Sequence, residues 1–257
     1  MYFDTHVHLN SDRYDDVDKL IEEALASGVK KMVVVGYDIE TSLKAVEIAS
    51  NFDFIYAAVG IHPSEVKKAK ISDLEIIEKC LINNKVVAIG EIGLDYHWDQ
   101  DNKEYQKRFF VEQLKLANKY DLPIIIHSRD AAKDTYDVLK ENKKYYKKGI
   151  MHCYSYSLEM AKLFIELNFK IAFGGALTFL NAKENKEIVK NLNIKDLLIE
   201  TDAPYLAPHP YRGKVNEPKY IKLVVEEIAR LKEMSVEEVA ETTYNNACDL
   251  FEVDKWK

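Results

Sequence analysis

Histidine and acidic side chains recur in this sequence at the points where short apolar runs end. The set comprises four imidazoles and two carboxylates: His6, His8, Glu91, His127, His152 and Asp202. Imidazole nitrogens and carboxylate oxygens are the groups with which proteins most often bind divalent metal ions. We therefore expect a metal site, provided that the fold brings the ends of these runs together.

The first pair, His6 and His8, is separated by one residue. In an extended chain, residues i and i+2 project to the same side, so both imidazoles can face one ion. An HxH pair alone fits two polar residues on an exposed strand equally well. Its position directly after apolar Tyr2 and Phe3 favours the interpretation as metal ligands.

Each of the two carboxylates has a structural alternative. Glu91 ends the run VVAIG, where an unpaired buried carboxylate is costly. An ion pair would neutralise it, but a position bridging two cations suits its two oxygens better. Asp202, in ETDAP, serves as a ligand, as a general base or as both, and the alternative is an Asx turn before Pro204.

Two further histidines, His127 and His152, end the successive runs PIII and GIM. Either one alone fits a hydrogen-bonded core histidine. Two on consecutive runs, at the same end of each, favour metal ligands.

The six residues suffice for two ions that share one carboxylate. The predicted arrangement has Glu91 as the bridge, one ion on His6, His8 and Asp202, and the other on His127 and His152. Each site keeps open positions for water, which catalytic sites need. Paired divalent ions about 3.5–4 Å apart activate water and stabilise both oxygens of an in-line displacement at phosphorus.

Several charged or polar residues accompany these ligands. His62, in GIHP, is expected near the site, where it can donate to the substrate. Arg129 is expected to point toward a phosphate. Arg212 and Lys214 lie in the last long loop, a common phosphate location in barrels, although Lys214 equally fits a solvated charge. Glu200 is expected to orient an imidazole or to pair with Arg129.

Aromatic residues that closely follow apolar runs are candidates for stacking on the bases of a nucleic acid. Among sixteen tyrosines and two tryptophans, Tyr96, Trp98 and Tyr154 have that position and are the better candidates. His97 and His209 lie in predicted loops, where an ordinary exposed histidine is at least as good an interpretation as any role.

β-rich apolar runs alternate with amphipathic stretches along the chain. Strands are predicted at Tyr2–Thr5, Lys31–Val35, Phe54–Gly60, Val86–Gly90, Pro123–Ile126, Gly149–His152, Lys170–Phe173 and Leu197–Glu200. Helices are predicted at Val17–Ala26, Ser42–Ser50, Asp73–Leu81, Glu104–Lys119, Lys219–Lys232 and Val236–Leu250.

Eight β-then-α units in 257 residues predict a closed (β/α)₈ TIM barrel, an α/β fold, as one domain over residues 1–257. Such barrels place their active sites at the C-terminal ends of the strands, where the six ligands fall. An open doubly wound sheet is the alternative, and the lack of a GxGxxG or GxxxxGKS motif counts against it.

The overall composition indicates which partners and which cellular location to expect. The formal net charge of -7 argues against a protein that coats DNA with a basic surface. It leaves room for a nucleic-acid enzyme, because metals and a few cations can hold a phosphate. Three widely spaced cysteines without CxxC predict a reducing cytoplasmic location. No apolar run approaches the ~20 residues of a membrane span, so no membrane association is expected.

Together the motifs resemble the TatD family of metal-dependent deoxyribonucleases, over essentially the whole chain. The matching segments are DTHVHL at Asp4, VGIHP at Val59, IGEIGLDY at Ile89, PIIIHSRDA at Pro123, MHCYS at Met151, GG at Gly174 and ETDAPYLAPHPYRGKVNEP at Glu200. The resemblance implies a TIM barrel with divalent metals on the six ligands. It also implies hydrolysis of DNA, in many members as a Mg²⁺-dependent 3′→5′ exonuclease.

The expected reaction is cleavage of a phosphodiester bond, with Asp202 as the proton acceptor from water. Arg129 and His62 would stabilise the developing charge. The identity of the two divalent ions stays open, because four imidazoles suit Zn²⁺ or Mn²⁺ better than Mg²⁺.

Two alternatives remain at this point, because a fold does not fix a substrate. One is an esterase or amidase on the same barrel, acting for example on an aminoacyl-tRNA bond. The other is a non-catalytic protein that binds metal or nucleic acid.

Overall fold

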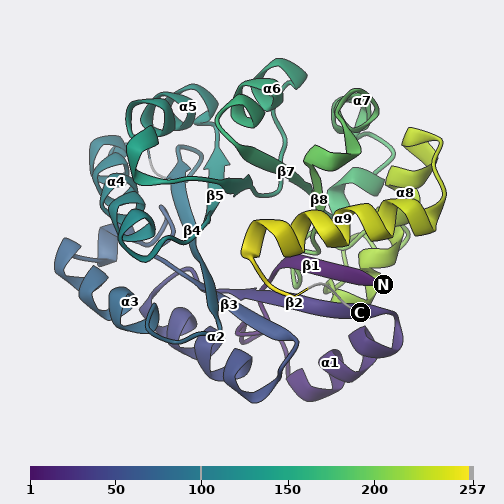
Figure 1. Cartoon of the computed structure of the whole chain (residues 1–257), viewed down its shortest axis with the longest axis horizontal. Helices are drawn as coiled ribbons and strands as arrows, with labels where there is room; N and C mark the ends of the chain where they lie inside the picture. Colours follow the sequence, from purple (N-terminus) through teal and green to yellow (C-terminus); the bar gives the residue numbers. More distant parts are fainter. Residues whose placement is uncertain (99, 255–257) are drawn as a thin grey trace.

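Eight parallel strands form a barrel in the computed structural model, which describes residues 1–98 and 100–254 (Figure 1). The strands follow one another around the sheet in chain order: β1 (Tyr2–Val7), β2 (Val29–Val35), β3 (Ile55–Val59), β4 (Val86–Asp95), β5 (Ile124–Arg129), β6 (Gly149–Met151), β7 (Phe169–Phe173) and β8 (Leu197–Ile199). Backbone hydrogen bonds from Asp202 to His6 and from His8 to Ala203, at 2.9 and 2.8 Å, join the last strand region to the first. The prediction of a TIM barrel is confirmed.

Three strands run further than their apolar runs predict. β1 reaches Val7, β4 reaches Asp95 and β5 reaches Arg129, so His6, Glu91 and His127 lie within strands. The apolar pattern ends early because these strand ends carry buried polar groups that contact one another across the barrel. β6 and β8, in contrast, stop one residue before His152 and Glu200, and not at them as predicted.

Helices connect the strands and cover the outside of the barrel. They are α1 (Val17–Ala26), α2 (Ile39–Asn51), α3 (Leu74–Cys80), α4 (Lys103–Tyr120), α5 (Ala132–Glu141), α6 (Leu158–Glu166), α7 (Lys183–Asn191), α8 (Ile221–Lys232) and α9 (Val236–Phe251). Short 3₁₀ turns lie at Val66–Lys68, Ile71–Asp73, Lys143–Tyr145, Gly175–Thr178, Ile194–Asp196 and Pro218–Tyr220. The six predicted helices are present, and α1 has the predicted bounds because Asp16 caps its first turn by accepting from the Lys19 N–H.

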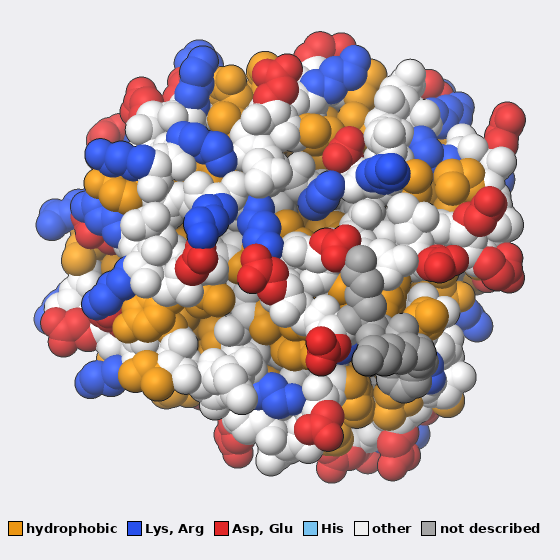
Figure 2. Space-filling model, viewed as in Figure 1, with side chains coloured by type: hydrophobic (Ala, Val, Ile, Leu, Met, Phe, Trp, Pro, Cys, Tyr) orange, Lys and Arg blue, Asp and Glu red, His pale blue; other side chains and the backbone are white. Residues whose placement is uncertain are grey.

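The last helix, α9, closes one end of the barrel. Its apolar residues, including Tyr244 and Phe251, pack on the side chains that fill the barrel interior, such as Phe3 and Ile125. Phe3 lies at the start of β1, so α9 covers the end at which the strands begin, and Figure 1 looks onto that end. Basic and acidic side chains are interspersed on this face (Figure 2). The predicted ligand residues lie at the opposite end, where the strands finish.

Within the described residues, no helix has the length and apolar character needed to cross a lipid bilayer.

Candidate metal centre

Glu91 on β4 lies at the centre of the predicted ligands. Its Oε2 is 3.5 Å from His6 Nε2. Its Oε1 is 2.9 Å from His127 Nδ1, and 3.7 Å from both His62 Nε2 and His152 Nε2. These imidazoles come from different βα units, so one carboxylate joins side chains across the mouth of the barrel.

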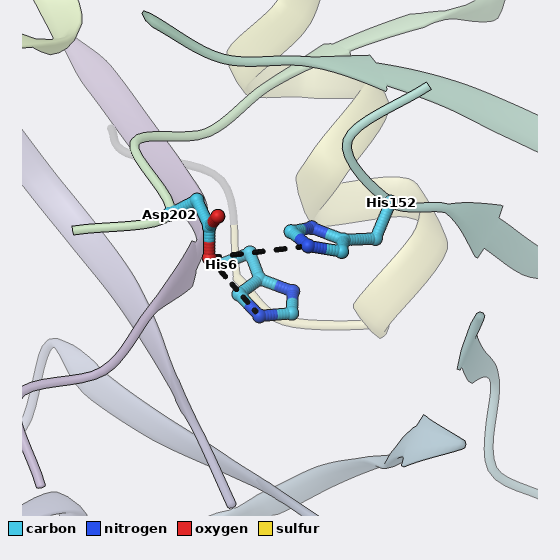
Figure 3. Close-up of side chains that lie close together, drawn as sticks. All are labelled: His6, His152 and Asp202. Carbon is cyan, nitrogen blue, oxygen red and sulfur yellow. Dashed lines mark ion pairs between the residues drawn. The ribbon is translucent and has the colours of Figure 1, made fainter. Parts of the chain in front are cut away.

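Asp202, just after β8, faces a second group of histidines (Figure 3). Its Oδ1 is 4.0 Å from His6 Nε2 and 3.9 Å from His152 Nε2, and the rings of these two histidines stack with centroids 3.6 Å apart. The same oxygen is 3.4 Å from His8 Nε2. The structure therefore brings all six sequence-predicted ligands into one cluster.

The hydrogen bonds of two histidines leave a nitrogen lone pair directed into this cluster. His8 Nδ1–H donates to the Val35 carbonyl, and His152 Nδ1–H donates to Glu200, each at 2.9 Å. In the neutral rings Nε2 is then unprotonated. The bond from His152 confirms that Glu200 orients an imidazole, and Glu200 also accepts the Cys153 N–H.

Two observations fit a cation at this position. His6 Nε2 and His8 Nε2 converge to 3.2 Å, a separation for which either a shared proton or a metal ion bound by both nitrogens accounts. The buried His6 Nδ1 has no hydrogen-bond partner among residues 1–98 and 100–254. The residues present thus fit divalent cations, with imidazole nitrogens and carboxylate oxygens as ligands.

The electrostatics of the cluster also favour positive charge. Burial would raise the pKa of Glu91, yet the surrounding histidines, His62 and His152 foremost, hold it well below its usual range. Burial would lower the pKa of His152, but Glu200 and Glu91 raise it to about 10. Buried carboxylates that overcome desolvation in this way create a site for a cation.

His127 differs from the predicted arrangement. We expected it beside His152 on a second ion, but both of its nitrogens lie against carboxylates: Nδ1 is 2.9 Å from Glu91 and Nε2 is 2.9 Å from Asp95. His62, Asp95 and His127 form a separate group of ligand atoms, whereas His152 groups with His6 and Asp202. β4 extends beyond its apolar run, which carries Asp95 into the site.

Asp95 is a site residue that the sequence analysis missed. It is buried at the end of β4, four residues after Glu91, and the period of two along a strand was the available signal. Its Oδ1 accepts the backbone N–H groups of His97 and Trp98, at 2.9 and 3.1 Å. The remaining oxygen, Oδ2, is fixed against His127.

Asp4 is a second buried carboxylate without an assigned role in the sequence analysis. It accepts hydrogen bonds from the N–H and hydroxyl of Thr201 and from the His6 N–H. Burial raises the pKa of Asp4 to about 7. Asp4 thereby ties β1 to the segment that carries Asp202.

His62 lies beside the cluster, as expected. Its ring is 4.2 Å from that of His127, between centroids, and Nδ1 accepts the Ser64 N–H at 3.1 Å. Burial and the neighbouring His127 lower the pKa of His62 to about 3. The neutral ring therefore carries its proton on Nε2, the atom that faces Glu91.

The predicted cationic residues lie at the surface of the protein, and no ion pair joins them to the cluster among the described residues. Arg129, Arg212 and Lys214 are exposed. The Arg129 guanidinium lies over Trp98, with Cζ 5.5 Å from the ring centroid, and Arg212 lies over Phe179 at 4.3 Å. Among the described residues no ion pair joins Arg129 to Glu200, so that alternative is wrong.

The stacking candidates divide clearly by exposure. Tyr96 and Tyr154 are buried, and their hydroxyls bond Asp134 and the Ser157 carbonyl, so the interpretation of these two as stacking residues is wrong. Trp98 is 70% exposed. His97 and His209 are exposed, as expected for loop histidines.

Comparison with known proteins agrees with this geometry. Residues 3–252 match the family model described as TatD related DNase. The chain is 50% identical over 255 residues to the uncharacterized metal-dependent hydrolase YabD of Bacillus subtilis, covering 99% of this chain and all of that one. YcfH of Escherichia coli, also an uncharacterized metal-dependent hydrolase, is 34% identical, with 98% of this chain and 96% of YcfH covered.

A solved structure shows the same fold throughout. The crystal structure of YjjV, a TatD homologue of Escherichia coli, superimposes with a TM-score of 0.93 at 34% identity and covers 98% of both chains. The family model and these relatives each extend over nearly the full length, and the chain therefore belongs to the TatD family of metal-dependent hydrolases.

Proposed function

We propose that this protein hydrolyses phosphodiester bonds of DNA, as a 3′→5′ exodeoxyribonuclease that acts on single strands or 3′ ends. The observation that carries the proposal is the convergence of six ligand-type side chains around Glu91 at the open end of the barrel. The name of the matching family supplies DNA as the substrate. The proposed unit of function is a single domain, residues 1–257.

The proposed cofactor is a pair of divalent ions. The ligands would be His6, His8, Glu91, His127, His152 and Asp202, with Glu91 shared between the ions and Asp95 beside His127. When bound, such ions supply Lewis acidity and lower the pKa of water. Family resemblance favours Mg²⁺, whereas four imidazoles suit Zn²⁺ or Mn²⁺.

Asp202 is proposed to accept the proton of the attacking water. Its Oδ1 faces the three histidines, and Oδ2 accepts no hydrogen bond from the part of the chain that the structure describes. Burial would raise the pKa of Asp202, but His8 and the other histidines lower it, so the carboxylate is ionised. A positioned base of this kind contributes about 10²–10⁴-fold to the rate.

His62 and three exposed cations are proposed to bind the phosphate. The neutral His62 presents its Nε2–H toward the cluster, where it can donate to a phosphate oxygen without adding a buried charge. Arg129, Arg212 and Lys214 lie on the surrounding surface, and a guanidinium binds two phosphate oxygens at once. Because these three side chains are exposed, their charged groups are accessible to a bound strand.

A cytoplasmic location is part of the proposal. In the described part of the chain, Cys80 and Cys153 carry no disulfide, which is the usual state in a reducing compartment.

The test is hydrolysis by purified protein loaded with Mg²⁺, Mn²⁺ or Zn²⁺. We expect labelled nucleotides to be released from 3′-labelled single-stranded DNA, and release to stop when a chelator is added. Blunt duplex DNA, an ester panel and an aminoacyl-tRNA are run in parallel. Turnover of an ester without release from DNA would contradict the proposal and favour an esterase on the same barrel. No turnover of any substrate would favour a binding protein.

A further inference from the structure

Three of the five arginines of the chain lie at the open end of the barrel. Arg13 follows β1, Arg129 ends β5 and Arg212 follows β8. Each guanidinium is placed over an aromatic ring of a neighbouring loop: Arg13 over Tyr205 at 5.0 Å, Arg129 over Trp98 at 5.5 Å and Arg212 over Phe179 at 4.3 Å from the ring centroid.

These three arginines differ from Arg230 on α8, which makes two hydrogen bonds to Glu227 at 2.8 and 2.9 Å. Over residues 1–98 and 100–254, none of the three forms an ion pair with a carboxylate. Within this described part of the chain, their charge is therefore not neutralised by a carboxylate. A guanidinium on a ring face keeps its N–H groups directed outward, available for a phosphate.

Two of the rings are exposed and attached directly to the metal centre. Trp98 is 70% and Tyr205 is 38% exposed. The backbone N–H of Trp98 donates to Asp95, whose other carboxylate oxygen contacts His127. The Tyr205 N–H donates to the Asp202 carbonyl, and its ring lies 5.8 Å from the ring of His8.

The order of the strands places these two aromatic pairs on opposite sides of the cluster. Trp98 follows β4 and Arg129 ends β5, whereas Tyr205 and Arg13 belong to the loops after β8 and β1. In a ring of eight strands, these two positions face each other across the mouth. A chain that passes from one to the other must cross the histidines and carboxylates between them.

We infer that unpaired nucleotides lie across the mouth of the barrel, with one base stacked on Trp98 and another on Tyr205 and with Arg13 and Arg129 on the flanking phosphates. This inference rests on the proposed function and names the side chains that would hold the single strand. Exposed aromatic faces beside cations are what sequence-independent binding of single strands requires. Bases within a duplex are stacked on each other and therefore cannot stack on these two rings.

The surface beyond Arg13 offers no excess of positive charge to a longer strand. A cavity of about 330 Å³ is lined there by four carboxylates, Asp15, Asp16, Glu23 and Glu217, and by the cations Arg13, Lys19 and Lys219. Lys219 is already paired with Glu23 and Glu217, each at 2.6 Å. The contacts of the proposed strand therefore end near Arg13.

The test measures binding separately from hydrolysis. The probe is phosphorothioate decathymidylate, which resists hydrolysis, added to the metal-loaded protein. Because stacking on a protein ring contributes to affinity base by base, Trp98→Ala and Tyr205→Ala should each weaken binding by roughly 5–150-fold. Trp98→Phe keeps a ring and should restore most of the affinity.

A matched control removes a cation–aromatic pair at the other end of the barrel. Lys144 lies over Tyr145 at 4.9 Å in the turn between α5 and β6, so Tyr145→Ala should bind the probe like the wild type. Arg13→Ala and Arg129→Ala should each reduce the salt dependence of binding, by about 0.7 in the slope of log affinity against log salt. Arg13→Lys keeps the charge and should retain that slope.

A spectroscopic signal reports stacking itself. With Trp256→Phe, Trp98 is the one remaining tryptophan of the chain. Decathymidylate should quench its fluorescence, whereas an abasic oligonucleotide with the same phosphates should not.

Several results would overturn the inference. They are no binding by the wild type, unchanged affinity in both alanine variants, equal affinity for a duplex, or equal quenching by the abasic probe. Retained binding and quenching without hydrolysis of natural DNA would contradict the proposed function alone.

Discussion

The two ends of this barrel differ in the chemistry of the side chains that they bury. At the end where the strands begin, α9 lays Tyr244 and Phe251 against Phe3, with ring centroids 5.9 and 5.7 Å apart. At the end where the strands finish, ionisable side chains are buried against one another: Asp4, His6, His8, Glu91, Asp95, His152, Glu200 and Asp202.

The two ends therefore contribute to different properties of one fold, the first to stability and the second to function. Burial of apolar rings stabilises the barrel directly. Burial of carboxylates and imidazoles costs free energy unless each charge is compensated, and here a bound divalent ion would complete the compensation. Substitutions at the two ends should therefore have separable effects on activity and on stability.

The largest effect on activity is expected for Glu91→Gln. The carboxylate contacts imidazoles on all sides of the cluster, and an amide cannot bridge two cations. Activity should fall by more than the about 10–100-fold that loss of an outer-sphere partner costs, and the metal content should fall with it. The measurement is turnover together with metal content after dialysis. Glu104→Gln, at an exposed glutamate on α4, is the matched control, and full activity in Glu91→Gln would exclude the bridging role.

Asp202→Asn should follow, with turnover lower by about 10²–10⁴-fold through loss of the proton acceptor, or by more because a metal ligand is also weakened. Asp202 has a φ of 54°, a conformation that asparagine tolerates as well as aspartate does. The circular dichroism spectrum should therefore be unchanged. Asp53→Asn, an exposed position before β3, controls for the change of charge. Nucleotide release at the wild-type rate in Asp202→Asn would count against the mechanism.

Asp95→Asn should have a smaller effect, about 10–100-fold in metal affinity or activity. Oδ1 would still accept the N–H groups of His97 and Trp98, so the loop keeps its anchor. The carboxylate opposite His127 Nε2 is lost, and the orientation of that ring loosens. Titration of metal-free protein with Mn²⁺ measures the affinity. An affinity equal to that of the wild type would show that Asp95 serves only the loop.

The sequence predicted the barrel and the six clustered side chains because both leave a recognisable pattern along the chain. Parallel strands buried on both faces appear as apolar runs, and a polar residue that ends such a run is conspicuous. His8, His127 and Asp202 were found in this way. Pattern alone did not predict which histidine groups with which carboxylate, because that depends on the staggering of neighbouring strands.

The features that the sequence did not predict depend on contacts between segments and not on a local pattern. Asp95 lies beyond the apolar run of β4, where the strand continues through a segment with buried polar contacts. The sequence did not show that Tyr96 and Tyr154 are buried whereas Trp98 is exposed. A position just after a strand does not fix the direction in which a side chain points. The pairing of Arg13 with Tyr205 joins loops nearly two hundred residues apart, which no local pattern records.

The smallest effect on activity, and a large effect on stability, is expected for Phe251→Ala. Phe251 is 4% exposed, and its ring packs on Phe3 where α9 closes the barrel. Truncation leaves a cavity in a packed core, which typically costs about 3–5 kcal/mol of unfolding free energy. Urea denaturation of the metal-free protein measures that loss, and Phe251→Leu should lose less because it fills more of the space. Turnover per folded molecule and metal content should match the wild type, since α9 packs at the end of the barrel away from the ligand cluster. A fall in metal affinity comparable to that of Asp95→Asn would show that the two ends are coupled through the strands, and the separation of stability from function would then be wrong.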